Sequence, residues 1–329
     1  MSNTVEIPRV PAPQRRFNDP DVTANGEPRA RVALQALTTL WFNTGTLCNI
    51  ACANCYIDSG PRNDRLVYLT LADIVPYLDE IATLGYPTRE IGFTGGEPFM
   101  NPGMIAMASA CLARGYDVLI LTNAMQPMQR SRTKDALLEL RATYGDALTL
   151  RVSVDHFSEA LHDGERGLGS FARTLEGLDW LSAHGFALDV AGRARFGEDE
   201  AALRDGYARL FGERGYAIDA ADPAQLVLFP EMDESAAVPE ITTACWGILD
   251  VSPAAMMCAS SRMIVRHKGA ATATVRPCTL LAYDTSFEMG ATLADAAVAD
   301  GGNFARGDVK LNHPHCAKFC VLGGGSCSQ

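Results

Sequence analysis

The sequence predicts an α/β protein built around a parallel sheet, because strand-like and helix-like segments alternate from about residue 36 to about residue 230. The strand-like segments are mainly apolar, which favours burial on both faces of the sheet. Repeated units of this kind form either a barrel or an open doubly wound sheet. In both architectures, ligands bind at the carboxyl ends of the strands.

The individual elements follow from apolar spacing and from the residues that start or stop helices. The predicted strands are 36–43, 90–94, 117–122, 148–153, 187–191 and 225–229. The predicted helices are 70–84, 104–114, 134–144, 171–184 and 200–214. Pro76 lies inside the first helix and predicts a kink there.

Three regions are expected along the chain. Residues 1–30 are rich in Pro and polar groups without periodicity, which predicts an extended N-terminal tail. Residues 31–235 contain the alternating elements. The alternation then ends, and six of the ten cysteines fall within residues 236–329. This last region is predicted to be a small Cys-rich domain.

The composition excludes several classes of protein. A net charge of −11 argues against a nucleic-acid partner, because binding a phosphate backbone needs a concentrated basic face. The sequence has no run of eighteen apolar residues, and its start lacks the apolar centre of a signal peptide. These features predict a cytoplasmic protein without a membrane partner. In that reducing compartment, cysteines are expected as metal ligands or core thiols rather than as disulfides.

The most informative stretch is Cys48-Asn-Ile-Ala-Cys52-Ala-Asn-Cys55-Tyr56. Iron–sulfur clusters are held by cysteine thiolates, and a 4Fe-4S cube takes four of them. Three thiolates from one short loop would leave one iron without a protein ligand, so that iron could bind another molecule. Zinc is the alternative, but a structural zinc site is usually closed by four ligands with paired C-x2-C spacing. The ligand count favours the cluster.

The spacing C-x3-C-x2-C followed by an aromatic residue resembles the cluster loop of the radical S-adenosylmethionine (SAM) enzymes. Cys48, Cys52, Cys55 and Tyr56 stand at the matching positions. The resemblance covers roughly residues 36–230 and implies a partial (β/α)6 TIM-like barrel. It also implies that the open iron of a 4Fe-4S cluster binds SAM, whose reductive cleavage yields a 5′-deoxyadenosyl radical.

The second predicted strand ends in Thr94-Gly95-Gly96-Glu97-Pro98, which matches the GGE motif of that family. The resemblance implies that Gly95, Gly96 and Glu97 bind the amino group of SAM. Glycines let the backbone approach a ligand closely, and a carboxylate can accept hydrogen bonds from an ammonium group. Read from the residues alone, the same segment could be any tight turn.

Polar residues follow the next three predicted strands. Alternation puts Ser153 and Asp155 on one face, and the family uses residues at this strand end to contact the ribose. Asn123 could take part in the site or cap a helix. Arg193 could form a bidentate pair with the methionine carboxylate, although Arg195 is an alternative and the fifth strand matches the family's pattern only in part.

The C-terminal cysteines resemble the SPASM and Twitch extensions of radical SAM enzymes, which hold auxiliary 4Fe-4S clusters. The residues that carry this resemblance are Cys258, Cys278, Cys316, Cys320 and Cys327. A full SPASM unit has further cysteines, so one auxiliary cluster is expected here, with Cys245 outside it. A zinc site that uses His313 or His315 with Cys316 and Cys320 is the alternative.

Together these features predict a radical SAM oxidoreductase that abstracts a hydrogen atom from a small-molecule or peptide substrate. No catalytic acid–base residue is required, because the cofactor performs the difficult step. A one-electron donor such as flavodoxin or ferredoxin is the expected partner. The chain has no room for an N-terminal leader-binding domain, which favours a small molecule or a peptide delivered by a separate protein. SAM-dependent methyl or sulfur transfer, and a non-enzymatic iron–sulfur carrier or scaffold, are the alternatives.

Overall fold

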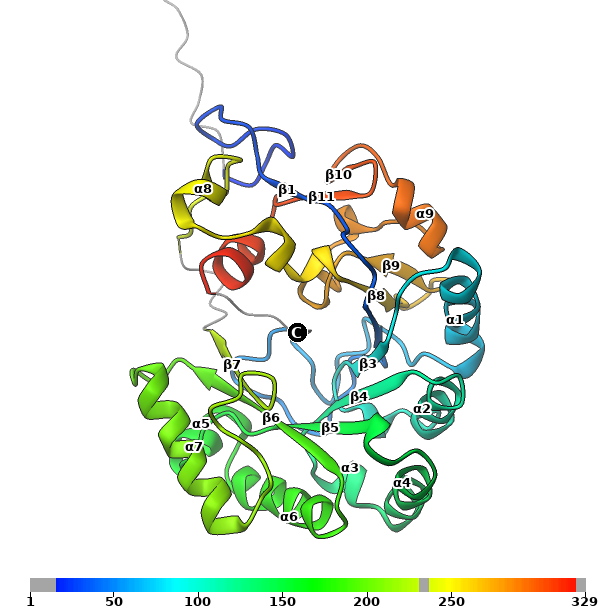
Figure 1. Cartoon of the computed structure of the whole chain (residues 1–329), viewed down its shortest axis with the longest axis vertical. Helices are drawn as coiled ribbons and strands as arrows, with labels where there is room; N and C mark the ends of the chain where they lie inside the picture. The colour runs from blue at the N-terminus through cyan, green and yellow to red at the C-terminus, as the bar shows by residue number, and fades with distance from the viewer. Residues whose placement is uncertain (1–15, 231–236, 324–329) are drawn as a thin grey trace, which may run out of the picture.

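The computed structural model describes residues 16–230 and 237–323, and its centre is a curved parallel sheet (Figure 1). The six strands predicted from the sequence are all present and pair in parallel in chain order. They are β2 (Thr39–Asn43), β3 (Glu90–Thr94), β4 (Asp117–Thr122), β5 (Leu148–Ser153), β6 (Ala187–Ala194) and β7 (Leu226–Pro230). The prediction of a partial (β/α)6 barrel is confirmed.

The helices that connect these strands cover the outer face of the sheet (Figure 1). The five predicted ones are α1 (Leu71–Leu84), α2 (Met104–Leu112), α4 (Ser131–Tyr144), α6 (Ser170–Ala183) and α7 (Glu200–Arg214). Thr70 and Asp73 form a capping box at the start of α1, and Gly85 ends that helix in a left-handed conformation. Two short helices were not predicted: α3 (Gln126–Gln129) and α5 (Glu159–Arg166).

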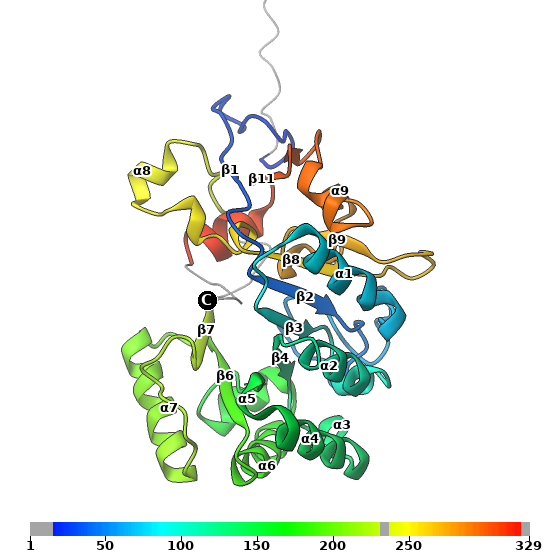
Figure 2. The ribbon, with the colours of Figure 1, turned by 45° about the vertical axis from the view of Figure 1, so that its right-hand side comes forward.

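The C-terminal region continues the same sheet rather than forming a layer of its own. Strand β8 (Ser261–Val265) pairs in parallel with β2, and β9 (Thr274–Arg276) pairs antiparallel with β8. The sheet order is therefore β7-β6-β5-β4-β3-β2-β8-β9, and Figure 2 shows β2 lying between β3 and β8. The boundary expected between residues 235 and 236 is crossed by this sheet, because β8 satisfies the backbone edge that β2 would otherwise leave open.

The rest of the C-terminal region consists of short elements around β8 and β9. They are α8 (Cys245–Leu249), α9 (Leu293–Val298), β10 (Phe304–Ala305), β11 (Asp308–Lys310) and a π-helical turn, Cys316–Val321. Strand β1 (Arg31–Val32) pairs antiparallel with β11. Within the two described ranges, no helix has the length and apolar character needed to cross a bilayer.

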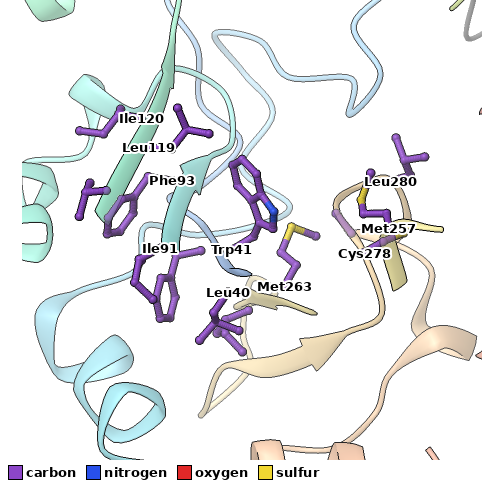
Figure 3. Packing of buried hydrophobic residues seen from close by; sticks show 14 of the residues in the cluster. Leu40, Trp41, Ile91, Phe93, Leu119, Ile120, Met257, Met263, Cys278 and Leu280 are labelled. Atoms are coloured by element: carbon purple, nitrogen blue, oxygen red, sulfur yellow. The ribbon is translucent and has the colours of Figure 1, made fainter. Parts of the chain in front are cut away.

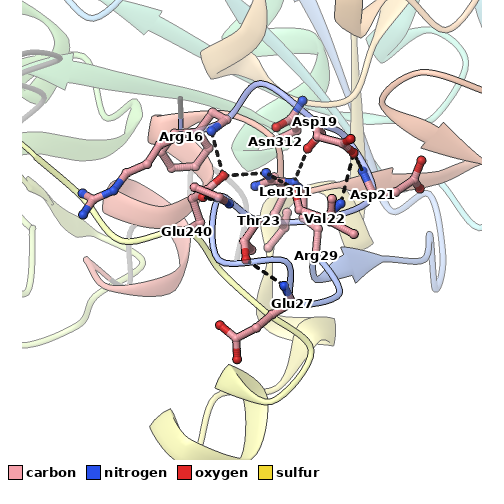
Figure 4. A network of polar contacts seen from close by, with 12 residues as sticks. Arg16, Asp19, Asp21, Val22, Thr23, Glu27, Arg29, Glu240, Leu311 and Asn312 are labelled. Atoms are coloured by element: carbon pink, nitrogen blue, oxygen red, sulfur yellow. Dashed lines mark hydrogen bonds and ion pairs between the residues drawn. The ribbon is translucent and has the colours of Figure 1, made fainter. Parts of the chain in front are cut away.

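Residues 16–30 differ from the extended tail that the sequence predicts, because they are folded against the C-terminal region (Figure 4). Arg29 is buried and forms an ion pair with Glu240, with 2.5 Å between Nη2 and Oε1. The same carboxylate accepts hydrogen bonds from the backbone N–H groups of Phe17 and Ala24, each at 2.7 Å. Residues 1–15 of the predicted tail lie outside the described residues.

The hydrophobic core runs without interruption from the barrel into the C-terminal region. Figure 3 shows Met263 of β8 beside Trp41 of β2. A Cβ at position 92 would lie 2.3 Å from the ring of Trp41, so only glycine fits on β3 opposite this indole. Phe42 and Phe93 stack with their centroids 5.8 Å apart. Because one core supports both regions, the strand ends of the barrel are held rigidly against the C-terminal loops.

Candidate active site

A pocket lies at the carboxyl ends of the parallel strands, where the cysteine loop crosses them. Ten of the residues predicted from the sequence to bind a cluster or SAM line this single pocket: Cys48, Cys52, Cys55, Tyr56, Gly95, Gly96, Asn123, Ser153, Asp155 and Arg193. They come from a loop and from the ends of β3, β4, β5 and β6. Such convergence is expected of a ligand site in a parallel barrel.

The cysteine loop is held in place by polar contacts with α5 and β6. Asn54 donates through Nδ2 to Glu165 Oε2 at 2.8 Å, and its backbone carbonyl accepts from Arg193 Nη1 at 2.6 Å. The N–H of Ala53 donates to the carbonyl of Glu165 at 2.8 Å. Arg195 forms an ion pair with the other oxygen of Glu165. The loop between the second and third cysteines is thereby fixed to the barrel.

The three thiols of the cysteine loop are placed to hold one cluster at the wall of the pocket. All of Cys48, Cys52 and Cys55 contribute to one wall, and the Cys55 sulfur accepts from the Ser59 N–H at 3.3 Å. The Ser59 hydroxyl is buried beside them without a hydrogen-bond partner among the described residues. Burial raises the pKa of Cys48 to about 12, so the thiol is protonated until a metal displaces the proton.

The described residues include no group of three His, Cys, Asp or Glu side chains that converge on a single metal ion. This concerns mononuclear sites such as zinc, in which every ligand points at one atom. An iron–sulfur cube distributes its cysteines over several irons, so its thiolates need to face a common cavity rather than a common point. The three loop cysteines meet that requirement.

The two glycines of the GGE segment let the end of β3 approach the cysteine loop. A Cβ on Gly96 would lie 2.2 Å from the carbonyl oxygen of Leu47, and one on Gly95 would lie 2.5 Å from that of Gly45. The N–H of Gly96 donates to the Gly45 carbonyl at 2.8 Å. Gly95 also has a φ of 138°, which side chains rarely adopt. No other residue would permit this contact without moving the loop.

Glu97 has a different position from the one predicted for a SAM ligand. Its carboxylate is buried, does not line the pocket and accepts from Thr122 Oγ1 at 2.9 Å and from the Asn123 N–H at 2.8 Å. Burial raises its pKa to about 7, against the lowering effect of these hydrogen bonds. The side chain joins the ends of β3 and β4 behind the pocket wall. The sequence places Glu97 correctly in the motif but cannot show which way it points.

Asn123 serves both the turn and the pocket. Its side-chain carbonyl accepts from the Met125 N–H at 2.9 Å, and its Nδ2 donates to Asn49 Oδ1 at 2.9 Å. The first contact stabilises the turn after β4, in agreement with the local role considered from the sequence. The second contact ties that turn to the cysteine loop.

Asp155 and Arg166 form a buried ion pair on the pocket wall, and Arg166 was not identified from the sequence. Arg166 donates through Nε at 2.9 Å and through Nη2 at 2.8 Å to the two carboxylate oxygens. Burial would lower the pKa of Arg166, but the charges of Asp155 and Cys52 raise it. Burial would likewise raise the pKa of Asp155, and Arg166 brings it below its usual value. No sequence feature pointed to Arg166, because α5 was itself not predicted.

The structure distinguishes between the two arginines considered after the fifth strand. Arg193 lines the pocket, whereas Arg195 does not and pairs with Glu165 instead. Alternation alone would put residues 193 and 195 on the same face, but β6 ends at Ala194, so Arg195 lies beyond the strand and does not follow its alternation.

Three of the predicted auxiliary cysteines come together from distant parts of the chain. Cys258, Cys278 and Cys316 are all buried. Burial raises the pKa of Cys316 well above its usual value, and Cys278 and Cys258 raise it further, so the three thiols are electrostatic neighbours. Cys320 is half-buried on the same π-helical turn as Cys316. Cys327 lies outside the described residues.

Cys245 and the two histidines of the zinc alternative are placed separately. The Cys245 sulfur lies 3.3 Å from the Thr242 N–H and 3.4 Å from its hydroxyl. The rings of His313 and His315 pack 4.6 Å apart, and burial lowers the pKa of His313 to about 4. His313 also packs on Phe287.

The auxiliary cysteine segments border the same pocket as the first cysteine loop. Leu280, two residues after Cys278, and Phe319, next to Cys320, both line it. Phe319 packs against Phe229 of β7 with a centroid distance of 5.7 Å. The C-terminal region therefore closes one side of a site whose other walls belong to the barrel.

A three-cysteine loop over the strand ends of a partial (β/α)6 barrel defines a class of iron–sulfur enzymes that bind SAM. Residues 42–191 match the family model described as the Radical SAM superfamily. The family uses a 4Fe-4S cluster and SAM.

Two curated relatives are each 29% identical to the chain over part of its length. The antilisterial bacteriocin subtilosin biosynthesis protein AlbA of Bacillus subtilis matches over 192 residues, 58% of this chain and 40% of AlbA. The mycofactocin maturase MftC of Mycobacterium ulcerans matches over 166 residues, 49% of this chain and 42% of MftC. The matched regions therefore span less than half of each relative.

Solved structures show the same fold at low sequence identity. Streptococcus suis SuiB bound to S-adenosylmethionine superposes with a TM-score of 0.57 and 13% identity, covering 81% of this chain and 66% of SuiB. Native anSMEcpe with bound AdoMet gives a TM-score of 0.56 and 12% identity, covering 80% and 81% respectively. These coverages exceed the barrel alone, so the likeness extends into the C-terminal region.

Proposed function

We propose that the chain is a radical SAM oxidoreductase that abstracts a hydrogen atom from a peptide substrate. The observation that carries this proposal is the shared pocket. The three-cysteine loop forms one wall, polar strand ends form a second, and Leu280 and Phe319 of the C-terminal region form a third. Such a pocket can hold a cluster, SAM and the reacting part of a substrate together and exclude water from them.

In this proposal Cys48, Cys52 and Cys55 hold the first cluster. When bound, a 4Fe-4S cluster and SAM supply the 5′-deoxyadenosyl radical that takes a hydrogen atom from the substrate. The contacts of Asn54 with Glu165 and Arg193 keep the loop in register with the strand ends. The protein thus fixes the distance between the cluster and the groups that hold SAM.

The proposed SAM contacts come from the remaining walls. Gly95 and Gly96 offer backbone groups to the amino end of the methionine, with Tyr56 and Asn123 beside them. Ser153 and Asp155 are suited to the ribose hydroxyls, and Arg193 to the carboxylate. Arg166 lies on the same wall, and its pairing with Asp155 holds that carboxylate ionised as a hydrogen-bond acceptor. Glu97 acts in this proposal as a positioning residue behind Asn123.

We assign one auxiliary 4Fe-4S cluster to the C-terminal region. Cys258, Cys278 and Cys316 supply three thiolates, and Cys320 or Cys327 supplies the fourth. The support is the electrostatic proximity of the first three and their burial next to the pocket. A cluster there would lie behind Leu280 and Phe319, on the substrate side of the cavity.

Several similar proteins favour a peptide over a small molecule as the substrate. AlbA is named for bacteriocin biosynthesis and MftC as a maturase. SuiB has been solved with its precursor peptide SuiA, at a TM-score of 0.55, and anSMEcpe with a peptide, at 0.54. A protein donor such as flavodoxin or ferredoxin would supply the electron.

The experiment that tests the proposed function is reductive cleavage of SAM. The anaerobically reconstituted chain, reduced with dithionite and mixed with SAM, should release 5′-deoxyadenosine, detected by chromatography. Cys52→Ala is the matched inactive control. A reconstituted protein that holds iron but consumes no SAM would support the electron-carrier alternative, and one that holds zinc and no iron would end the proposal.

The substrate class is tested separately by isotope transfer. Candidate precursor peptides encoded near the gene, deuterated at their side chains, should transfer deuterium into 5′-deoxyadenosine. Transfer from free amino acids or other small molecules, with none from the peptides, would contradict the peptide assignment and leave the radical chemistry standing.

A further inference from the structure

Among the residues that the structure describes, Arg262 on β8 is a buried cation without an acidic partner. It is 2% exposed, and its Nη1 donates to the carbonyls of Cys258 at 2.6 Å and Ser261 at 2.8 Å. Nη2 reaches the carbonyl of Gly307 at 3.5 Å. Among the described residues, no carboxylate lies within ion-pair distance of this guanidinium, although Asp308 is a more distant neighbour.

Such an arrangement is costly unless another negative charge is nearby. Arginine stays protonated in proteins, so burial cannot be relieved by loss of its proton. An ion that is buried without a partner destabilises the folded state, because it loses its hydration without a compensating charge. Backbone carbonyls offset part of that cost, but they carry no net charge. Arg262 therefore needs a compensating negative charge, and no carboxylate among the described residues provides it.

The ionisable groups with the strongest electrostatic influence on Arg262 are cysteines. Burial lowers the pKa of its guanidinium, and the leading influences that oppose this are Cys258 and Cys278. These are two of the three thiols that meet in the C-terminal region. Arg262 also fixes the Cys258 backbone directly, through the 2.6 Å hydrogen bond to its carbonyl.

We propose that Arg262 is the fixed countercharge of the auxiliary cluster and raises its reduction potential. The inference rests on the proposed function, because it requires a cluster on Cys258 and Cys278. A cysteine-bound cluster becomes more negative on reduction, and a buried positive charge stabilises that form more than the oxidised one. Charge and hydrogen bonds near the ligands are among the features by which a protein sets the potential of such a cluster.

Arg276 on the neighbouring strand β9 provides a matched comparison. It is also fully buried, and it donates to a carbonyl, that of Asp284, at 2.9 Å. In contrast to Arg262, it has a carboxylate partner, Glu288, at 3.1 Å. Its electrostatic neighbours are Glu288 and Asp284, with no cysteine among them. A neutral residue at position 276 should therefore disturb packing without changing the charge at the cysteines.

A small bound anion is the other possible countercharge for Arg262 and has to be distinguished from the cluster. Arg262 lines a cavity with Tyr86, Arg306 and Asp308 on the side of β8 near β11. A small anion in that cavity could also compensate Arg262. An anion would stabilise the apoprotein, whereas a cluster acts only after reconstitution, so the two can be separated experimentally.

The test uses the full chain with Cys48, Cys52 and Cys55 replaced by Ala, so that only the auxiliary cluster remains. Redox titration followed by electron paramagnetic resonance should show a lower potential in Arg262→Met than in its parent. The expected change in the reduced-to-oxidised ratio at fixed potential is at least tenfold, which is ~59 mV for one electron. Arg276→Met should leave the potential unchanged.

Further variants keep the outcome decisive. Arg262→Lys retains the charge and should retain most of the potential; a shift as large as that of Arg262→Met would overturn the proposal. The iron-free Arg262→Met protein should be at least as stable to urea as its parent. Stabilisation of the iron-free parent by chloride or sulfate that Arg262→Met loses would assign the countercharge to the cavity and also overturn the proposal.

Failure of the proposed function gives a different result. If the background protein binds no iron after reconstitution, the auxiliary cluster itself is wrong. If it binds a cluster whose potential is the same in the parent and in Arg262→Met, the cluster stands and the role of Arg262 is wrong.

Discussion

The two cysteine groups of this molecule are built in opposite ways. Cys48, Cys52 and Cys55 lie within eight residues of one loop and all face the pocket. Cys258, Cys278 and Cys316 span 59 residues of the C-terminal region and are buried, and none of these three sulfurs belongs to a residue that lines the pocket. The first group is open toward a ligand, whereas the second reaches the pocket only through Leu280 and Phe319.

This difference indicates separate roles for the two groups, ligand binding for the first and charge storage or electron transfer for the second. A loop of three thiolates leaves room for a small molecule on the remaining iron, and polar strand ends surround that room. A buried group behind apolar side chains is suited to holding charge or passing an electron, because low solvent access and fixed cations set its potential. If the two groups are independent, a change in one group should leave the function of the other largely intact.

The largest effect is expected from the cysteines themselves. Replacing Cys52 by Ala should bring 5′-deoxyadenosine formation below detection, because the open iron is lost with the first cluster. Replacing Cys316 by Ala should leave SAM cleavage within about tenfold of wild type, although uncoupled from substrate. Chromatography of the quenched reaction measures both. Equal loss in the two variants would mean that the groups depend on each other.

The second-largest effect, on stability, is expected from the ion pair of Asp155 and Arg166 beside the first cysteine group. Arg166→Met should lower the free energy of unfolding by about 3 kcal/mol, because Asp155 is left as an unpaired buried charge. The double variant Asp155→Asn with Arg166→Met should recover much of that loss. Urea denaturation of the iron-free protein measures this, since the pair is formed without a ligand. A double variant no more stable than the single one would show that charge is not the cause.

The raised pKa of Glu97 predicts that the stability of the folded chain depends on pH. Its pKa is raised from 4.5 to about 7 in the folded chain, so the folded state binds more protons than the unfolded state between these values. Relative to Glu97→Gln, the wild type should therefore lose stability as pH rises through this window, by roughly 1 kcal/mol per unit. Below 4.5 and above 7 the difference should be level. A wild type that instead gains stability relative to Glu97→Gln as pH rises would show that the pKa of Glu97 is lowered in the folded chain.

The smallest effect should come from the contact between β3 and the loop. Gly96→Ala places a methyl group 2.2 Å from the Leu47 carbonyl, so the loop must move, at a cost of about 1–2 kcal/mol. The first cluster should also be retained less well, as measured by iron content. Gly212→Ala is the control: it lies inside α7 with open space around it and should stabilise the chain by about 0.5 kcal/mol.

Much of the barrel could be predicted because its signals are local. The strands 117–122 and 148–153 and the helix 200–214 have the bounds expected from their apolar runs and terminal residues. The short helix α5 was missed because it has only eight residues, most of them charged or polar, and contains no apolar run. Arg166 was missed with it, since nothing in the sequence relates that residue to Asp155.

The sequence by itself determined the three-cysteine loop, the glycines that follow β3 and the positions of the barrel strands along the chain, because each is encoded within a short window of residues. Only the tertiary structure decided that β8 joins the barrel sheet, that Glu97 points away from the pocket, and that Cys258, Cys278 and Cys316 meet next to Arg262. Those features depend on which distant segments pack together. Packing is set by the shape of the whole core, and no local pattern records it.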